Sequence, residues 1–423
     1  MGILSRAKKG LKRLKQKGFI LADYADKTNE YFFGPYGRNS SPFGRLVELS
    51  ARNQYNHDKD SCLQTPDRIA IFAAYSNRLA ASTKAYIQAL NQAGFAVVYI
   101  NNTTTLESEI PIILKLAWRA LDRVNIGRDI GAYKDGILLL QSEGHLDKCE
   151  LLGIFNDSTT FIPGKNTDEL VREINSFSES PYKGLFSHAS TDVKPHYQSF
   201  FQILKPEIFR SNRFLNFWGS YRHISHRGHS IYNGEIALST KVYDHFKPNM
   251  VLYSSELLIA HLSELHEAGD GLIYSEVLEL LPSISRSVDT GSAGYSLRCI
   301  LEHKDKELRI SNLDLYRVAE LIENSNPSHM AAFLYPLYLR CPLVKNDLCS
   351  AGTYSLAQAA SLLSKALNNS VNTNDDAKQA RLILEEFIQV INSKGTPRSY
   401  INNTRDASIK GITSGFVYPK FHE

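Results

Sequence analysis

The chain of 423 residues has few cysteines and no long apolar run. Its five cysteines are scattered, and none belongs to a C-x-x-C pair: Cys62, Cys149, Cys299, Cys341 and Cys349. This pattern argues against a disulfide framework or a zinc knuckle and indicates a reducing setting. No segment reaches the ~18 consecutive apolar residues that span a bilayer. Glycine, proline and charged residues are near ordinary frequency, which excludes collagen-like, disordered and coiled-coil classes.

Positive charge is concentrated at the N-terminus. The sequence has 48 Lys plus Arg and 44 Asp plus Glu, and seven of the basic residues lie in residues 1–20 with no acid among them. The remainder carries 41 basic and 44 acidic groups, a balance of −3. A nearly neutral body offers no broad basic face, so nucleic acid is not an expected partner.

Residues 1–20 have the pattern of a basic amphipathic helix. Leu4, Ala7, Leu11 and Leu14 recur every three or four residues, with Lys and Arg between them. The segment lacks the 7–15-residue apolar core of a secretory signal. Such a helix can lie on an anionic membrane surface. A solvated basic tail and a helix that binds a partner protein are the alternatives.

The length predicts two or three domains at about 150 residues each. Residues 21–65 are polar and turn-rich, and they are predicted to be a lead-in segment before the first domain. After Pro66, apolar strands alternate with helical patterns. The predicted strands are Arg68–Tyr75, Phe95–Ile100, Leu151–Phe155, Gly184–Ser187 and Phe200–Leu204, with a short segment at Arg119–Val124. The predicted helices are Ser82–Ala93, Leu106–Leu116, Ile130–Ser142, Asn212–Trp218 and Tyr232–His245.

Helical patterns dominate from about Ser254. They are Glu256–Glu267, Leu313–Ile322, Leu356–Leu367 and Ala377–Ile391, with a polar loop at Asn368–Asp376. The predicted organisation is therefore a segment at 1–20, a lead-in at 21–65, an α/β domain at 66–253 with a mostly parallel sheet, and a helical region at 254–423. Ligands bind at the carboxyl ends of parallel strands. Polar residues follow four strands there, at Tyr75–Asn77, Asn101-Asn102, Asn125–Tyr133 and Asn156–Ser158.

Several polar groups in the α/β domain have the chemistry of a binding site. The glycines of Asn125–Gly136 permit a tight turn and close approach to a ligand, although a plain helix entry looks the same. Asp157 at a strand end can hold a divalent cation or can close an Asx turn. His196, Gln198 and Ser199 can bind sugar hydroxyls or lie on an ordinary strand. Glu235, near a predicted helix start, can act as a general base or complement the helix dipole.

The order of these motifs resembles the rhamnan synthesis F family over roughly residues 66–253. The residues that carry the resemblance are Tyr75, N-x-G-x-D-x-G-A-Y-K at Asn125–Lys134, Asn156-Asp157-Ser158, H-x-Q-S at His196–Ser199, and Phe217-Trp218. Members are bacterial glycosyltransferases that build cell-wall rhamnans, O-antigens and related polysaccharides. The resemblance implies a GT-A-like nucleotide-sugar-binding fold.

The resemblance also implies roles for individual residues. The expected donor-binding residues are Tyr75, Asn101, Asn125, Gly127, Asp129, Gly131, Tyr133, Lys134 and Asn156. Asp157 is the expected ligand of a divalent cation, Mg²⁺ or Mn²⁺, and Asn156 leaves it as the single carboxylate of its motif. Gln198, Ser199 and Trp218 are the expected acceptor-binding residues. Glu235 is the expected catalytic base, with His196 as the second candidate.

The expected function is transfer of a sugar from a nucleotide diphosphate donor to a lipid-linked glycan. Rhamnose is the expected sugar. The direct alternative is a galactofuranosyl- or other hexosyltransferase on the same scaffold. A non-catalytic carbohydrate-binding assembly subunit is the alternative from another class. The expected location is the cytoplasm, at the inner face of the plasma membrane, through the basic segment.

Overall fold

The structure is a computed structural model that describes residues 22–37, 45–50, 65–191, 193–268, 277, 279–282, 322, 326–351 and 353–394. The predicted basic segment at 1–20 lies outside these residues. So does the predicted helix Leu313–Ile322, apart from its last residue. No helix in the described ranges is long and apolar enough to cross a membrane.

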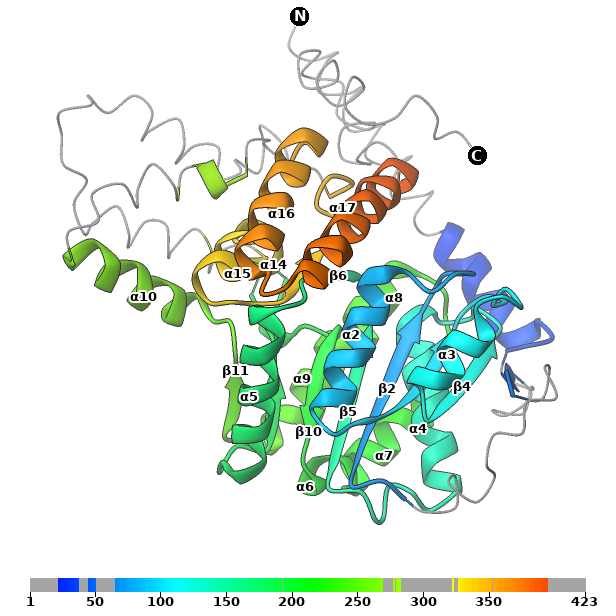
Figure 1. Cartoon of the computed structure of the whole chain (residues 1–423). Helices are drawn as coiled ribbons and strands as arrows, with labels where there is room; N and C mark the ends of the chain where they lie inside the picture. Colours follow the sequence, from blue (N-terminus) through cyan, green and yellow to red (C-terminus); the bar gives the residue numbers. More distant parts are fainter. Residues whose placement is uncertain are drawn as a thin grey trace, which may run out of the picture.

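The centre of the molecule is a sheet of eight strands among the described residues, in the order β1-β4-β3-β2-β5-β10-β7-β11 (Figure 1). The strands are β1 (Leu46–Glu48), β2 (Arg68–Ala74), β3 (Ala96–Asn101), β4 (Arg119–Arg123), β5 (Leu151–Asn156), β7 (Gly184–Phe186), β10 (Phe201–Leu204) and β11 (Asn249–Val251). Four of the seven pairings are parallel, and β2 pairs in parallel with both β3 and β5. The predicted α/β class with a mostly parallel sheet is confirmed.

Two further antiparallel pairs lie outside the main sheet in the described part of the chain. They join β6 (Thr159–Phe161) to β12 (Leu343–Lys345), and β8 (Ala189–Ser190) to β9 (His196–Tyr197). The first pair connects the α/β domain to the predicted helical region.

Helices cover both faces of the sheet (Figure 1). In and near the α/β domain they are a helix at 22–33, α2 (Ala81–Gln92), α3 (Ile110–Leu116), α4 (Arg128–Ser142), α5 (Lys165–Glu179), α6 (Pro206–Phe209), α7 (Asn212–Ser220), α8 (Arg227–His229), a π-helix (Ser230–Ile236), α9 (Ala237–Lys241) and a 3₁₀-helix (Tyr243–His245). The later helices are α10 (Ser255–Glu267), α14 (Pro327–Met330), α15 (Leu334–Tyr338), α16 (Leu356–Ser370) and α17 (Asn374–Lys394). The loop predicted at Asn368–Asp376 is therefore shorter, because α16 runs to Ser370 and α17 begins at Asn374.

Alternate residues of β2 enter two separate cores, as the two-residue period of a strand requires. Ala70, Phe72 and Ala74 pack with α2, α3 and α5. Ile69, Ile71 and Ala73 pack with α4, α6 and α7. A strand buried on both faces has a continuous apolar sequence, which is why β2 and β5 were predictable.

The C-terminal helices share the first of these cores. Phe333, Leu363 and Phe387 are buried in the same cluster as Phe72 and Tyr86. In Figure 1, α17 lies beside α2 at the carboxyl end of β2, and the two helices are in contact. The described residues of the predicted region 254–423 therefore pack onto the α/β domain.

A carboxylate of α17 caps α2. The residue before α2 is Ala80, whose side chain cannot cap the helix. The backbone N–H groups of Ala81 and Ser82 instead donate to Glu386, at 2.8 Å from Ala81 and 3.4 Å from Ser82. A helix N-terminus carries partial positive charge, so this contact joins the two regions through charge and hydrogen bonding.

We therefore predict that Glu386→Ala lowers the free energy of unfolding by about 1 kcal/mol, the usual effect of losing an N-cap. Urea unfolding of the full chain measures this. Glu385→Ala is the matched control, because Glu385 is the adjacent residue and is exposed. Equal stability of the two variants would contradict the capping role.

Candidate active site

Strand order reverses between β2 and β5, which places a crevice at their carboxyl ends. β2, β3 and β4 follow one another toward one edge, whereas β5 lies on the other side of β2. In open α/β sheets the ligand crevice lies at such a switch point. A cleft of about 820 Å³ occurs there, lined by Tyr75, Asn125, Asp129, Asn156 and Asp157 among others. All five were predicted from the sequence.

A smaller cavity of about 380 Å³ adjoins this cleft. The two share Arg128, Asp129 and Ser158 as lining residues. The smaller cavity is lined further by the predicted residues His196, Gln198, Ser199 and Glu235. The predicted residues that line a cavity are thus divided between two adjoining spaces, which we call the strand-end cleft and the Glu235 cavity.

A third cavity, of about 780 Å³, lies between α7, the π-helix and the helix at 22–33. Its lining includes Tyr24, Phe217 and Asn233. None of the predicted catalytic or donor-binding residues lines it, and it is away from the strand ends. The strand-end cleft with the Glu235 cavity is the candidate site.

Asp157 ties together the ends of β2 and β5. Its Oδ2 accepts a hydrogen bond from the backbone N–H of Tyr75 at 2.7 Å, and its own N–H donates to the carbonyl of Ala73 at 3.1 Å. The Asn346 side chain donates to the Asp157 carbonyl at 2.9 Å. The Tyr75 side chain is 64% exposed at the cleft. Asp157 therefore lies on the cleft wall and also fixes the backbone of Tyr75.

Asn156 connects the end of β5 to α4. Its Nδ2 donates to Oδ2 of Asp129 at 3.0 Å, and its Oδ1 accepts from the N–H of Ser158 at 3.0 Å. Both side-chain groups of this buried amide are thus engaged within the site. This contact orients Asp129 at the boundary between the two cavities.

Glu235 faces the smaller cavity from the π-helix. The prediction of a helix start beside it is wrong, because the chain is already helical from Arg227. The favourable charge of a helix N-terminus therefore does not act on Glu235. π-Helical turns are rare and often occur at functional sites, where they redirect a side chain. The Ser199 hydroxyl donates to Oε1 of Glu235.

Burial raises the pKa of Glu235, and the charge of Asp129 raises it further. The Ser199 hydrogen bond and the electrostatic influence of His196 and Lys345 oppose this rise. A carboxylate with a raised pKa is a stronger proton acceptor than an exposed one. The position of Glu235 thus suits proton abstraction.

His196 lies beside this carboxylate with a defined tautomer. Its Nδ1 is 2.7 Å from the carbonyl of Lys194, which can only accept, so Nδ1 carries the hydrogen. In the neutral ring, the Nε2 lone pair then accepts from the Gln198 amide nitrogen at 3.4 Å, and Nε2 lies 3.8 Å from Oε2 of Glu235. His196 thus presents an acceptor nitrogen to the Glu235 cavity.

Other predicted donor-binding residues lie beneath the cleft and shape it. Gly127 has φ +76°, and a Cβ there would lie 2.9 Å from the backbone of His223, while a Cβ at Gly131 would lie 2.4 Å from the Ile126 carbonyl. These glycines allow close packing of the chain itself. The hydroxyl of buried Tyr133 donates to the Ser199 carbonyl at 3.1 Å, which links α4 to the Glu235 cavity.

Lys134, Asn101 and Trp218 line neither cavity of the candidate site. The Lys134 ammonium donates to the Tyr221 carbonyl at 2.6 Å, and its burial lowers its pKa to about 8. Asn101 is fully buried and bonds to the backbone of Ser76, so Asn102 lies on the cleft wall instead. Trp218, predicted to bind the acceptor, lies fully buried in the second core. Size and aromatic character alone could not separate packing from binding.

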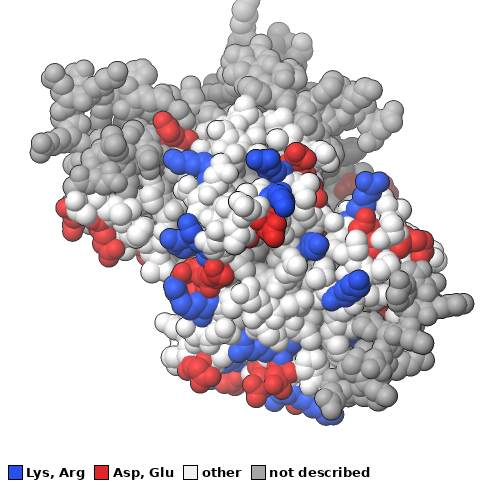
Figure 2. All heavy atoms as spheres, viewed as in Figure 1, with Lys and Arg blue, Asp and Glu red and all other residues white. Residues whose placement is uncertain are grey.

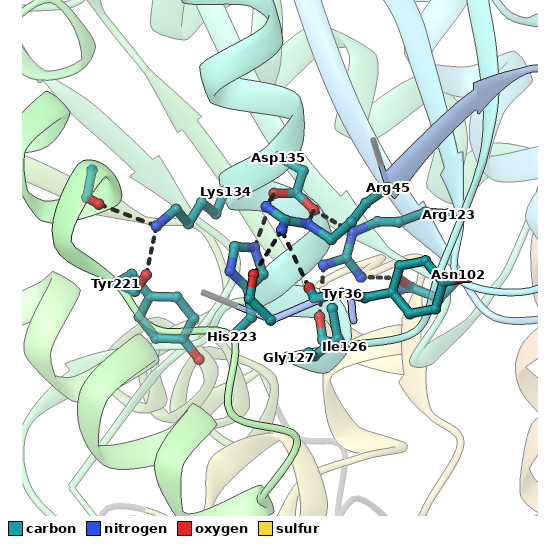
Figure 3. Close-up of polar contacts among 12 residues, drawn as sticks. Tyr36, Arg45, Asn102, Arg123, Ile126, Gly127, Lys134, Asp135, Tyr221 and His223 are labelled. Carbon is teal, nitrogen blue, oxygen red and sulfur yellow. Dashed lines mark hydrogen bonds and ion pairs between the residues drawn. The ribbon is translucent and has the colours of Figure 1, made fainter. Parts of the chain in front are cut away.

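A buried charge network lies below the site (Figure 3). Asp135 of α4 accepts hydrogen bonds from Arg123 Nε at 2.6 Å and from Arg45 at 3.0 and 3.1 Å. The His223 ring nitrogen Nε2 is 2.9 Å from the same carboxylate. Burial alone would raise the pKa of Asp135, but Arg123, His223 and Arg45 hold it well below its usual range.

The site does not fit a metal ion held by the protein alone. No group of three or more His, Cys, Asp or Glu side chains within the described ranges is arranged to hold a metal. The other carboxylates that line the same cleft are engaged: Asp129 accepts from Asn156, Glu386 from the α2 backbone, and Glu30 pairs with Lys27. One oxygen of Asp157 itself accepts the Tyr75 N–H. Ca²⁺ takes about six to eight oxygen ligands, and Mg²⁺ is usually bound through one or two carboxylates together with waters and substrate phosphates, so this site would need a bound substrate to complete a metal's coordination.

The sequence interpretation missed Arg128, Lys345 and Asn346. Arg128 lies inside the predicted motif and borders both cavities. Lys345 lines the Glu235 cavity, and its ammonium donates to the Ser158 hydroxyl at 3.0 Å. The pairing of β12 with β6 brings Lys345 and Asn346 to the site from almost 190 residues away. No local sequence pattern predicts such a long-range contact.

Residues 97–273 match the family model described as rhamnan synthesis protein F. This match confirms the resemblance for that part of the chain and links it, at a general level, to rhamnan and polysaccharide synthesis. An uncharacterized protein of Sinorhizobium fredii (strain NBRC 101917 / NGR234), y4gN, is 30% identical over 174 residues, which cover 40% of this chain and 44% of the relative. The matched part thus spans less than half of that relative's length. The family match includes Asp129 and Glu235 but neither Tyr75 nor Lys345.

The charge network generates a stability prediction. Asp135→Asn leaves Arg45 and Arg123 buried without their anion, which should lower the free energy of unfolding by about 3–5 kcal/mol. Because the Asp135 pKa is depressed on folding, its stabilisation is present above the ordinary pKa near 3.9 and is lost as pH falls through the lower folded value. Urea unfolding at neutral pH measures the loss. The exposed Asp147→Asn is the control, and equal stability of both variants would contradict the network's role.

Proposed function

We propose that the protein is a glycosyltransferase of bacterial cell-surface polysaccharide synthesis. It transfers a sugar, rhamnose as the first donor sugar to test, from a nucleotide diphosphate to a hydroxyl of a lipid-linked glycan. The observation that carries this proposal is Glu235, a carboxylate with a raised pKa, held by Ser199 in a cavity that opens into the strand-end cleft. The family match supports polysaccharide synthesis in general.

The fold supports a GT-A-like assignment. Four neighbouring strands have the order β4-β3-β2-β5. The first of these four in the sequence, β2, lies third, which is the order of a mononucleotide-binding half-sheet. The antiparallel β10 next to β5 carries the chain from the sheet toward α6 and α7. Such a sheet presents a nucleotide crevice at the ends of β2 and β5.

The two cavities suggest how the donor lies. The exposed Tyr75 ring offers a flat apolar surface on which a nucleobase can stack. The nucleoside then occupies the strand-end cleft, and the sugar occupies the Glu235 cavity. The diphosphate lies between them, where Arg128, Asp129 and Ser158 border both spaces.

In the proposed reaction, the acceptor hydroxyl attacks the anomeric carbon of the donor sugar. The bond from that carbon to the diphosphate oxygen breaks, and the nucleoside diphosphate leaves with the bonding electrons. Glu235 takes the hydroxyl proton as the new glycosidic bond forms. The hydrogen bond from Ser199 holds the carboxylate, and His196 is the second candidate for the base.

Two alternatives share this site. A galactofuranosyl- or other hexosyltransferase would use the same groups on another donor. A non-catalytic binding subunit would hold sugars and release no nucleotide. Incubation with dTDP- and UDP-sugars and a lipid-linked acceptor, with the nucleoside diphosphate measured, separates the enzymes from the binding subunit.

We predict that Glu235→Gln lowers turnover by about 10²–10⁴, the usual effect of removing a general base, and changes donor affinity only a few-fold. Since the base must be ionised, the wild-type rate should rise with pH through a midpoint above that of an ordinary glutamate. Steady-state kinetics against pH measure both effects. Asp244→Asn, an exposed acid paired with Lys247, is the control.

Activity of Glu235→Gln near the wild-type level would remove Glu235 from the mechanism. If His196→Ala then lost activity, the base would be His196.

We propose further that residues 1–20 bring the enzyme to an anionic membrane surface, where a lipid-linked acceptor resides. The helix at 22–33 follows this segment directly, and its residues Lys27 and Glu30 line the strand-end cleft. Deletion of residues 1–18 should abolish co-sedimentation with vesicles that contain phosphatidylglycerol and leave the melting temperature nearly unchanged. If the full-length protein did not co-sediment with such vesicles at low salt, this role would be contradicted.

A further inference from the structure

We propose that Arg128 and Lys345 hold the donor diphosphate at the junction of the strand-end cleft and the Glu235 cavity, in place of a metal ion bound by the protein. This inference rests on the proposed function. It assigns the diphosphate subsite to two cations, one from the first turn of α4 and one from the strand β12 of the C-terminal region.

Arg128 has an unusual backbone and an unused side chain. Its φ is +59°, a left-handed conformation that costs a non-glycine residue energy and that often marks functional sites. The side chain is exposed and borders both cavities. Among the described residues, no group forms a hydrogen bond or ion pair with its guanidinium. A strained residue thus presents a free, bidentate cation at the junction.

Lys345 approaches the junction from the other side. Its ammonium donates to the Ser158 hydroxyl at 3.0 Å and lies 4.5 Å from the centroid of the Phe200 ring. Ser158 itself borders both cavities. No carboxylate of the described residues lies within ion-pair distance of this ammonium. An ammonium has three donors, so it can bind a phosphate oxygen while it keeps its contact with Ser158.

The other charges near the junction are largely engaged. Asp129 accepts from Asn156, and Glu235 accepts from Ser199. Asp347 lies 2.9 Å from His329 and 3.7 Å from Arg227. Arg128 and Lys345 are therefore the cations left to meet the negative charge of a diphosphate. The first turn of α4, which contains Arg128, adds the positive end of that helix dipole.

The phosphate-binding position that is usual for such a sheet is already occupied by a carboxylate of the protein. In nucleotide-binding α/β folds, the helix after the first strand presents its N-terminal amides to phosphate. Here that helix is α2, and the carboxylate of Glu386 accepts the N–H groups of Ala81 and Ser82. A second anion at this point would meet the charge of Glu386. The diphosphate is therefore directed toward α4 and β12.

The test is equilibrium binding of UDP, dTDP and their nucleosides to the full chain by calorimetry, in EDTA and in Mg²⁺. The wild-type protein should bind a nucleoside diphosphate in EDTA, more tightly than the nucleoside. Arg128→Asn and Lys345→Gln should each weaken diphosphate binding at least about tenfold, as expected for a charged hydrogen bond, and leave nucleoside affinity unchanged. Asparagine tolerates φ > 0, so Arg128→Asn should fold as stably as the wild type.

Arg128→Lys, which keeps the charge, should recover part of the affinity, and Arg172→Gln on α5 should have no effect, since Arg172 is exposed and paired with Glu169. If nucleotide binding required Mg²⁺ and its affinity were the same in both variants as in the wild type, the inference would be overturned and the proposed function would stand. Folded protein that binds no nucleotide in either buffer would overturn both.

Discussion

The candidate site depends on one buried carboxylate. Asp135 is fully buried on α4 and is bound by Arg45 from the segment before β1, by Arg123 at the end of β4 and by His223 after α7 (Figure 3). An unpaired charge at this depth would be strongly unfavourable, so these elements must meet there for the protein to fold. The network thereby fixes the first turn of α4, which carries Arg128 and Asp129, relative to the strand ends. The positions of the proposed binding groups therefore follow from a constraint of folding.

The C-terminal region completes the site that the sheet begins. β12 pairs with β6 directly after Asp157 and places Lys345 and Asn346 at the junction of the cavities. Phe387 and Ile383 of α17 line the strand-end cleft, and Glu386 of the same helix caps α2. A sheet without these residues would lack one wall of its cleft. On the face shown in Figure 2, Lys and Arg side chains are interspersed with Asp and Glu.

The sheet was predictable from sequence because its central strands are buried on both faces. β2 and β5 are continuous apolar runs, and their observed bounds differ from the predicted ones by one residue. The helix α5 was missed, although Leu170, Ile174 and Phe177 form its buried face at helical spacing and its polar positions fit an amphipathic helix. The strands β1, β6, β11 and β12 were missed because each has only three residues, too few to show a two-residue period. The short segment at Arg119–Val124 is β4.

The sequence indicated many of the residues that line the candidate site, but it did not indicate which way each side chain points. The motif Asn125–Lys134 was singled out as a unit, yet only Asn125, Arg128 and Asp129 of it line the cleft. Lys134 and Tyr133 turn inward because α4 begins at Arg128, which sets the face that each residue takes. The start of that helix could not be placed from spacing, since its cap is a glycine with positive φ. Glu235 lines the same cavity as His196, Gln198 and Ser199, but the π-helix that carries it has no recognisable sequence pattern.

We propose that the strand-end cleft and the Glu235 cavity together bind a nucleotide sugar. A thermal-shift panel of nucleotide diphosphate sugars on the full chain tests it most directly. At about 100 times its dissociation constant, the true donor should add ~2.7 kcal/mol of stability and raise the melting temperature, whereas the free sugar should not. If no nucleotide sugar in the panel raised the melting temperature of the folded protein, the account would be contradicted.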